Sequence, residues 1–298
     1  MRLRAVLNRD GGTLKTADLE ALTTAIVSGF TACGHVIDYD IVTGAMIGDA
    51  LEIAFSEPSV DGVIAGGGDG TVSAAAALAW KHEKALGVLP AGTMNLFART
   101  LAIPLELNAA IAALAEGKIA DADIATANDR PFIHQFSLGI QPRMVVEREK
   151  LDHRSRSGKI LAIARASLSP LLRPPAFRVE IALDGTTEEH KVSMLAISTN
   201  PHGVTLLPIA ESIDAGVLGV YRIDRLAMRQ AFKVAIGFLH GRWRNRDTLN
   251  VCRVRSVILR FPEIKPGARA SIDGELTELH EYIEFRLHPG ALKVLVPQ

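Results

Sequence analysis

A short apolar run that ends in a glycine-rich turn constrains the fold of this chain more than any other stretch. Residues 63–65 are apolar, residues 66–71 read Gly-Gly-Gly-Asp-Gly-Thr, and an alanine-rich segment follows to Leu78. This order predicts a buried strand, a tight turn and a helix. Glycine leaves no side chain to keep a ligand away, and the first amides of a helix have no partner within it. The stretch therefore predicts a cradle for phosphate.

The sequence of this turn also allows other interpretations. In the simplest one, Asp69 or Thr71 only caps a helix after an ordinary glycine turn. Two better-known phosphate motifs are excluded, because no Gly-Lys-Ser/Thr follows and Thr71 stands where the dinucleotide fingerprint needs its third small residue. The turn therefore indicates a phosphate site of some other plan.

The first part of the chain alternates between strand and helix patterns. Strands are expected at residues 3–7, 36–41, 63–65 and 85–89, and helices at about 16–31, 45–55, 72–78 and 94–99. Such alternation predicts a largely parallel α/β layer structure. Turns that follow parallel strands lie at one edge of the sheet. We therefore expect the turns at residues 8–13, 66–71 and 90–95 to converge.

The pattern changes after about residue 121. Short alternating runs separated by Asp-Gly or Pro-Gly turns predict a mostly antiparallel second domain. These runs are residues 177–183, 193–199, 217–223, 256–261 and 282–287, with helices expected at 160–172 and 225–239. A chain of 298 residues also favours two domains. The expected domains are residues 1–125, with the tail 288–298 packed on them, and residues 126–287.

Composition limits the function classes. With only Cys33 and Cys252, neither a disulfide framework nor a four-thiolate zinc site is available. Neither a signal peptide nor an apolar run of about 18 residues is present, so a soluble cytoplasmic protein is expected. The chain is neutral overall, yet residues 222–260 hold ten Arg or Lys and two Asp, a formal charge of +8. A second basic cluster at residues 143–159 nets +3. These residues form either a solvated face or a surface that attracts anionic lipid headgroups.

Four ordered motifs carry a family resemblance. They are Gly67-Gly68-Asp69-Gly70-Thr71, the segment from Leu89 to Arg99, Asp273-Gly274-Glu275, and the closing residues 289–297. In these residues the chain resembles the diacylglycerol kinase catalytic-domain family, the bacterial lipid kinases related to sphingosine and ceramide kinases. The resemblance implies an α/β nucleotide-binding domain like that of NAD kinases and phosphofructokinases. It also implies a mostly antiparallel β-sandwich domain for the lipid substrate, with the nucleotide in the cleft between the domains.

The resemblance also assigns roles to residues. Glu275 matches the proton acceptor for the lipid hydroxyl, and Asp69 is the acid expected to orient Mg²⁺. The positions implied for ATP binding are Asn8, Gly66, Gly67, Gly68, Gly70, Thr71, Gly92, Thr93 and Asn95. Two positions depart from the family pattern, because Leu96 and Ala215 stand where aspartates are usual. These departures suggest that a structural magnesium site is absent or rebuilt, with Asp214 as its remaining candidate ligand.

The resemblance implies an ATP- and Mg²⁺-dependent kinase of a lipid hydroxyl, with diacylglycerol as the default acceptor. Sphingoid and glycerophospholipid acceptors stay open. The expected location is the cytoplasm, with peripheral association to an anionic membrane surface; no nucleic-acid partner is expected, and a homodimer is left open. One alternative is an NAD kinase, disfavoured because the Asn-Asn-Glu signature of that family is missing. Another is a membrane or nucleic-acid binder whose nucleotide site has decayed. Without the resemblance, Asp273-Gly274-Glu275 would indicate an ordinary hairpin turn.

Overall fold

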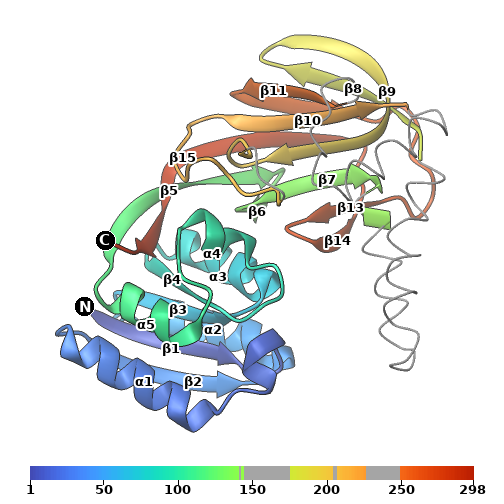
Figure 1. Cartoon of the computed structure of the whole chain (residues 1–298). Helices are drawn as coiled ribbons and strands as arrows, with labels where there is room; N and C mark the ends of the chain where they lie inside the picture. The colour runs from blue at the N-terminus through green and yellow to red at the C-terminus, as the bar shows by residue number, and fades with distance from the viewer. Residues whose placement is uncertain (141, 144–174, 204–206, 226–248) are drawn as a thin grey trace. The chain divides into compact units, whose positions relative to one another are not determined.

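The chain divides into two compact units. The computed structural model describes residues 1–140, 142–143, 175–203, 207–225 and 249–298. Unit 1 contains residues 1–124, 209–215 and 288–298, and unit 2 contains residues 125–208 and 216–287 (Figure 1). The helices predicted at residues 160–172 and 225–239 lie outside the described residues, apart from residue 225 itself.

Unit 1 is built on a parallel sheet. Strands β1 (Arg2–Asn8), β2 (Val36–Val42), β3 (Gly62–Gly67) and β4 (Ala85–Pro90) lie in the order β2-β1-β3-β4. The end of β15 (Tyr282–Val296) joins β4 in parallel, with Val294 opposite Leu86. Every residue of β3 and β4 is buried, as expected for central strands covered on both faces. The predicted α/β class of this half is confirmed.

Helices cover the two faces of this sheet. Helix α1 (Leu19–Ala32) packs with α5 (Leu107–Ala115) on one face, and α2 (Ile47–Ser56) packs with α3 (Asp69–Lys81) on the other (Figure 1). The short elements are α4 (Leu96–Thr100) and the 3₁₀ turns η1 (Gly12–Lys15) and η2 (Gly44–Met46). No helix in the described part of the chain has the length and apolar character needed to span a bilayer.

Helix α5 is absent from the elements predicted above. Its sequence nevertheless carries two helix signals. Glu106 precedes it and caps its first amides, and its buried residues recur at helical spacing, as at Ala110, Ile111 and Leu114. These features are typical of an amphipathic helix.

Unit 2 consists largely of antiparallel strands. Their order is β14-β13-β7-β9-β8-β12-β15, with β10 between β9 and β11, and with β5 paired to β6 and β15. Strand β5 (Lys118–Ala127) begins in unit 1 and ends in unit 2. The other strands are β6 (Arg130–Phe132), β7 (Gln135–Gly139), β8 (Phe177–Leu183), β9 (Thr186–Ser198), β10 (Leu218–Asp224), β11 (Asn250–Val254), β12 (Ser256–Arg260), β13 (Arg269–Ile272) and β14 (Glu275–Glu278). Phe136 and Phe285 meet edge to face in the core, with ring centroids 5.0 Å apart. The antiparallel class predicted for this half is confirmed.

Two Asp-Gly pairs form tight hairpins in unit 2. Asp184 and Gly185 join β8 to β9, and Asp273 and Gly274 join β13 to β14. All four have positive φ, 46° and 89° in the first pair and 48° and 89° in the second. Two-residue hairpins of this kind need positive φ at both positions, and Asp-Gly provides it. The second turn makes Glu275 the first residue of β14.

Candidate active site

The three glycine-bearing turns of unit 1 meet at one edge of the parallel sheet. Backbone hydrogen bonds join them, since Thr13 donates its N–H to the Ala91 carbonyl at 2.8 Å and Ala91 donates to the Gly67 carbonyl at 3.0 Å. The Asn8 side-chain amide also donates to the Thr71 hydroxyl at 3.3 Å. The turns therefore converge, as the parallel topology predicts.

Two of the glycines are required by this packing. A Cβ added to Gly92 would lie 2.6 Å from the Gly68 Cα, and one added to Gly67 would lie 2.6 Å from the Thr71 Cβ. At Gly68 a Cβ would make only an ordinary 3.5 Å contact with the Gly92 Cα, and its φ of −87° suits any residue. Packing does not explain a glycine at position 68. Its role in nucleotide binding stays a prediction.

The other predicted nucleotide positions lie along the same turns. Gly66 is buried near the end of β3, Gly70 is half-buried in the first turn of α3, and Thr93 is exposed. Asn95 has a left-handed φ of 50°. Its side chain forms two hydrogen bonds with the backbone of Gly92, accepting from the Gly92 N–H at 2.7 Å and donating to the Gly92 carbonyl at 2.9 Å. These two bonds stabilise the turn after β4.

Asp69 organises the backbone of the neighbouring turn. One carboxylate oxygen accepts the Asn95 N–H at 3.0 Å, and the other accepts the Leu96 N–H at 2.7 Å. The side chain thereby ties the start of α3 to the start of α4. A carboxylate has about four acceptor positions, so these two bonds leave capacity for another ligand. Its magnesium role stays a prediction.

The predicted metal ligands are not part of a larger cluster. Among the described residues, no group of three or more His, Cys, Asp or Glu side chains could hold a metal ion. Asp214 is exposed and accepts a hydrogen bond from the Ser212 hydroxyl. Mg²⁺ is commonly held by one or two carboxylates together with substrate phosphates. A cation that arrives with a nucleotide would therefore not need such a cluster.

A buried aspartate that sequence reasoning missed joins three distant segments of unit 1. Asp123 lies in β5 and its exposed fraction is only 2%. Its carboxylate accepts the Gly290 N–H at 2.9 Å, and its own N–H donates to the Ile213 carbonyl at 2.7 Å. These bonds connect residues 209–215 and the C-terminal segment to the first unit.

Glu275, the predicted proton acceptor, lies in unit 2 and forms an ion pair with Arg130. The Arg130 guanidinium donates through Nη2 to Glu275 Oε2 at 3.0 Å. The two side chains are 42% and 58% exposed. An exposed pair of this kind typically stabilises a protein by only about 0.2–1 kcal/mol. The ion pair between Arg130 and Glu275 therefore contributes little to the stability of the fold.

The hairpin that carries Glu275 is anchored by the residue two positions before it. Asp273 is 9% exposed, and its carboxylate accepts three backbone N–H groups. These belong to Ile133 at 3.0 Å, His134 at 3.0 Å and Gln135 at 2.9 Å. The anchor docks the β13–β14 turn against the connection between β6 and β7. Sequence reasoning singled out the motif Asp273-Gly274-Glu275 but assigned a role to Glu275 alone, and it missed Arg130.

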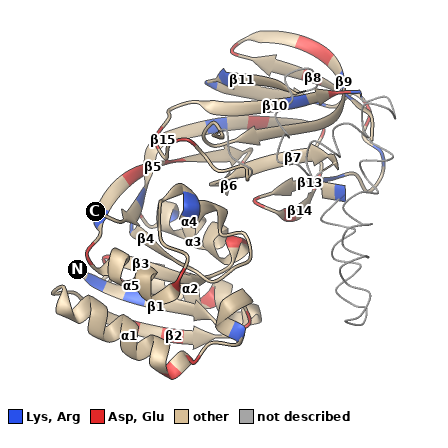
Figure 2. Cartoon of the chain, in the orientation of Figure 1, with Lys and Arg blue, Asp and Glu red and all other residues tan. Residues whose placement is uncertain are grey.

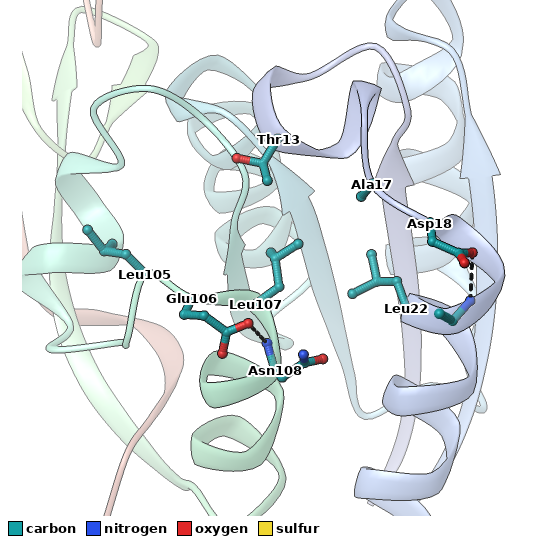
Figure 3. Close-up of a pocket in the computed structure, with 9 residues that line it drawn as sticks. Thr13, Ala17, Asp18, Leu22, Leu105, Glu106, Leu107 and Asn108 are labelled. Carbon is teal, nitrogen blue, oxygen red and sulfur yellow. Dashed lines mark hydrogen bonds between the residues drawn. The ribbon is translucent and has the colours of Figure 1, made fainter.

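A hollow of about 320 Å³ opens between the first turns of α1 and α5 (Figure 3). Asp18 caps α1 by accepting the N–H groups of Glu20 and Ala21. Glu106 does the same for α5, and the N–H groups of Ala109 and Asn108 lower the pKa of its carboxyl below the ordinary 4.5. Carboxylates already occupy both helix starts, so the hollow does not suit an anion. None of the predicted nucleotide positions lines it.

The segment that carries the three joined turns matches a known protein family. Residues 2–127 match the family model of the diacylglycerol kinase catalytic domain. This segment belongs to that family. The resemblance inferred from the four motifs is thereby confirmed. The diacylglycerol kinase match includes all three converging turns, and Asp273 and Glu275 lie beyond it.

Relatives and solved structures agree with this assignment. Proteins of Staphylococcus aureus strains JH9 and N315, each named "putative lipid kinase", are 25% identical over 241 residues, which is 77% of this chain and 75% of the relative. Two structures from Bacillus anthracis strain Sterne, described as those of a "putative diacylglycerol kinase", superpose with a TM-score of 0.76. They are 22% and 24% identical, cover 99% of this chain, and are covered over 95% and 97% of their own length. At these identities the structures show a shared fold.

Proposed function

We propose that this protein is an ATP-dependent lipid kinase that transfers the γ-phosphate of ATP to a lipid hydroxyl, with diacylglycerol as the first candidate acceptor. The observation that carries the proposal is that the diacylglycerol kinase match over residues 2–127 coincides with the three joined turns. This match supports membership in a kinase family. The identity of the acceptor and the use of ATP are what we propose beyond it.

The residues at the turns suit a nucleotide phosphate. Helix α3 is 13 residues long, and its N-cap is Gly68, so no side chain caps its first amides. The dipole of such a helix favours an anion at its start. Asp69, at the first position of α3, is the candidate to hold the hydrated cation that accompanies ATP. Bound Mg·ATP would supply the transferable phosphoryl group and neutralise its charge.

The chemistry asked of the chain is modest. Phosphoryl transfer depends mainly on positioning and on charge stabilisation. In the proposed step, the acceptor oxygen bonds to the γ-phosphorus, its proton passes to the Glu275 carboxylate, and ADP leaves. A general base of this kind typically contributes about 10²–10⁴-fold to the rate.

Transfer of labelled γ-phosphate from ATP is the direct test. Diacylglycerol, a sphingoid base and a glycerophospholipid would be offered in mixed micelles, with NAD as a soluble control. Labelling of a lipid and not of NAD is expected. Labelling of NAD alone would favour the NAD kinase alternative, and labelling of none of them would overturn the proposal.

The role of Glu275 can be tested separately. Glu275→Gln keeps the size of the side chain but removes the ionised acceptor, so transfer should fall by about 10²-fold or more. ATP affinity and the unfolding midpoint should stay at their wild-type values. Glu278→Gln, three residues further along the same exposed strand, is the matched control. A Glu275→Gln protein with full activity would remove this residue from the mechanism.

A further inference from the structure

The structure provides Glu275 with a partner that no sequence motif identifies. Arg130 precedes it by 145 residues and donates to one of its two carboxylate oxygens. We propose that Arg130 is a positioning residue for Glu275, holding the carboxylate in the orientation needed to accept the proton. This inference rests on the proposed kinase function.

The backbone brings the two residues together independently of their ion pair. The three N–H groups that bind the Asp273 carboxylate come from residues 133–135, immediately after the strand that begins with Arg130. Asp273 also donates its own N–H to the Gln135 carbonyl at 2.9 Å. Glu275 follows Asp273 by two residues, and Arg130 precedes Ile133 by three. A shared anchor therefore fixes both main chains.

The strand that carries Arg130 is held from its other side as well. Its first residue pairs with Ala127 across the two-residue loop of β5 and β6. In that loop the Asn128 side chain accepts the Glu284 N–H at 2.9 Å and donates to the Tyr282 carbonyl at 3.2 Å. The guanidinium thus projects from a backbone with few alternative conformations. A rigid supporting backbone places a functional side chain more precisely than a mobile one does.

The contact leaves part of the carboxylate available. Arg130 donates to Oε2 at 3.0 Å, so Oε1 can face an acceptor hydroxyl while Oε2 stays tethered. Glutamate has several rotatable bonds, and an exposed carboxylate samples many directions when it has no tether. A tether on one oxygen narrows this range and favours the reactive orientation of the other.

The space around Arg130 makes a specific test feasible. The residue lines a hollow of about 310 Å³ whose other walls include apolar side chains, as at Phe136 and Ile272, and acidic ones, as at Asp129 and Glu278. Truncation of the Arg130 side chain would enlarge this hollow. A small guanidinium ion could then take the place of the missing group.

The experiment measures lipid phosphorylation by the full chain, with kcat and KM determined separately. Arg130→Ala should lower kcat about 10- to 100-fold, in the range expected for a misplaced catalytic group, with little change in KM for ATP. Arg130→Lys should keep much of the activity. Millimolar guanidinium chloride should restore activity to Arg130→Ala and not to Glu275→Gln, and an equal concentration of sodium chloride should restore neither.

Arg286→Ala is the matched control, because Arg286 is exposed in unit 2 and pairs with Glu284 at 2.9 Å. It should retain wild-type kcat. The positioning role is overturned if Arg130→Ala keeps wild-type kcat, if guanidinium fails to rescue a folded Arg130→Ala, or if Arg286→Ala loses as much activity. Should Arg130→Ala fail to fold, a low kcat in a folded Arg130→Gln that guanidinium leaves unchanged would also overturn it. A wild-type protein that labels no lipid overturns the proposed function and this inference together.

Discussion

At the scale of single residues, two carboxylates of the sequence motifs act through backbone N–H groups. Asp69 and Asp273 each organise a turn that carries predicted site residues. The motifs alone identified both positions, since Asp69 follows three glycines and Asp273 belongs to an Asp-Gly turn. Their partners were not predictable, because the Asp69 bonds span 26 and 27 residues and the Asp273 bonds span 138–140. The residue type of an aspartate indicates a turn. Which N–H groups its carboxylate binds is decided only by the folded chain.

Asp69→Ala tests this structural role separately from catalysis. The change leaves the N–H groups of Asn95 and Leu96 without their acceptor, so the free energy of unfolding should fall by about 1–3 kcal/mol. Urea unfolding in the absence of nucleotide measures the effect. Asp38→Ala, at an exposed side chain 3.8 Å from Arg2, should change the same quantity by less than about 0.5 kcal/mol. Equal stability of the two variants would show that the Asp69 bonds contribute little.

At the scale of elements, strands β1, β3 and β4 were predictable because each contains a short apolar run bounded by turn residues. Strand β15 was not predictable as one element. Its 15 residues include Pro289 and Gly290, which read as a break in a local pattern. Its first part pairs with β12 in unit 2 and its end with β4 in unit 1. Tertiary pairing therefore decides the length of this strand, and local pattern does not.

The close approach of two turns leads to a further prediction at this scale. Gly92→Ala would place a Cβ 2.6 Å from the Gly68 Cα and 2.8 Å from the Asn95 side-chain oxygen. The turns would have to separate, which should weaken ATP binding at least tenfold and lower the free energy of unfolding by about 1–3 kcal/mol.

Gly48→Ala is the matched control for that change. Gly48 lies in α2, and a Cβ there would meet nothing within 4 Å. It should leave ATP binding unchanged and raise the free energy of unfolding by about 0.5–1 kcal/mol, because alanine is the better helix former. Calorimetric titration with ATP and urea unfolding provide both readouts. Wild-type ATP affinity in Gly92→Ala would contradict the proposed role of the joined turns.

At the scale of the whole molecule, the chain returns to unit 1 twice after leaving it, through residues 209–215 and 288–298. The family resemblance predicted the second return, since a closing segment of this kind is typical of the family. No local pattern predicted the first. A backbone hydrogen bond from Asp123 to the carbonyl of Ile213 helps to attach it. Any residue except proline has such a donor, so composition cannot reveal it.

The uneven distribution of charge is also a property of the whole molecule. The basic stretch 222–260 has a formal charge of +8 in a chain whose total charge is zero. Its described part places Lys or Arg on β10 and β11 (Figure 2). Local partners balance some of this charge. Arg222 pairs with Asp224 at 2.9 Å, and the Arg260 guanidinium lies 5.5 Å from the centre of the Tyr282 ring. Residues 226–248 and most of the cluster at 143–159 lie outside the described residues. Arg253 and Arg255 are exposed positions of this stretch at which its role can be tested.

We propose that this stretch attracts the protein to anionic membranes, where the proposed lipid substrate would be found. Vesicles rich in phosphatidylglycerol should sediment with the protein, and phosphatidylcholine vesicles should not. Since each basic residue near such a surface contributes about 1 kcal/mol, neutralising both side chains by Arg253→Gln and Arg255→Gln should weaken binding roughly 30-fold.

Lys118→Gln removes an exposed charge from β5 and should have no effect. Higher salt should release the wild-type protein because it shortens the range of the attraction. Equal sedimentation with both vesicle types would instead identify the basic stretch as a solvated face, and access to the lipid would then have to depend on apolar contacts alone.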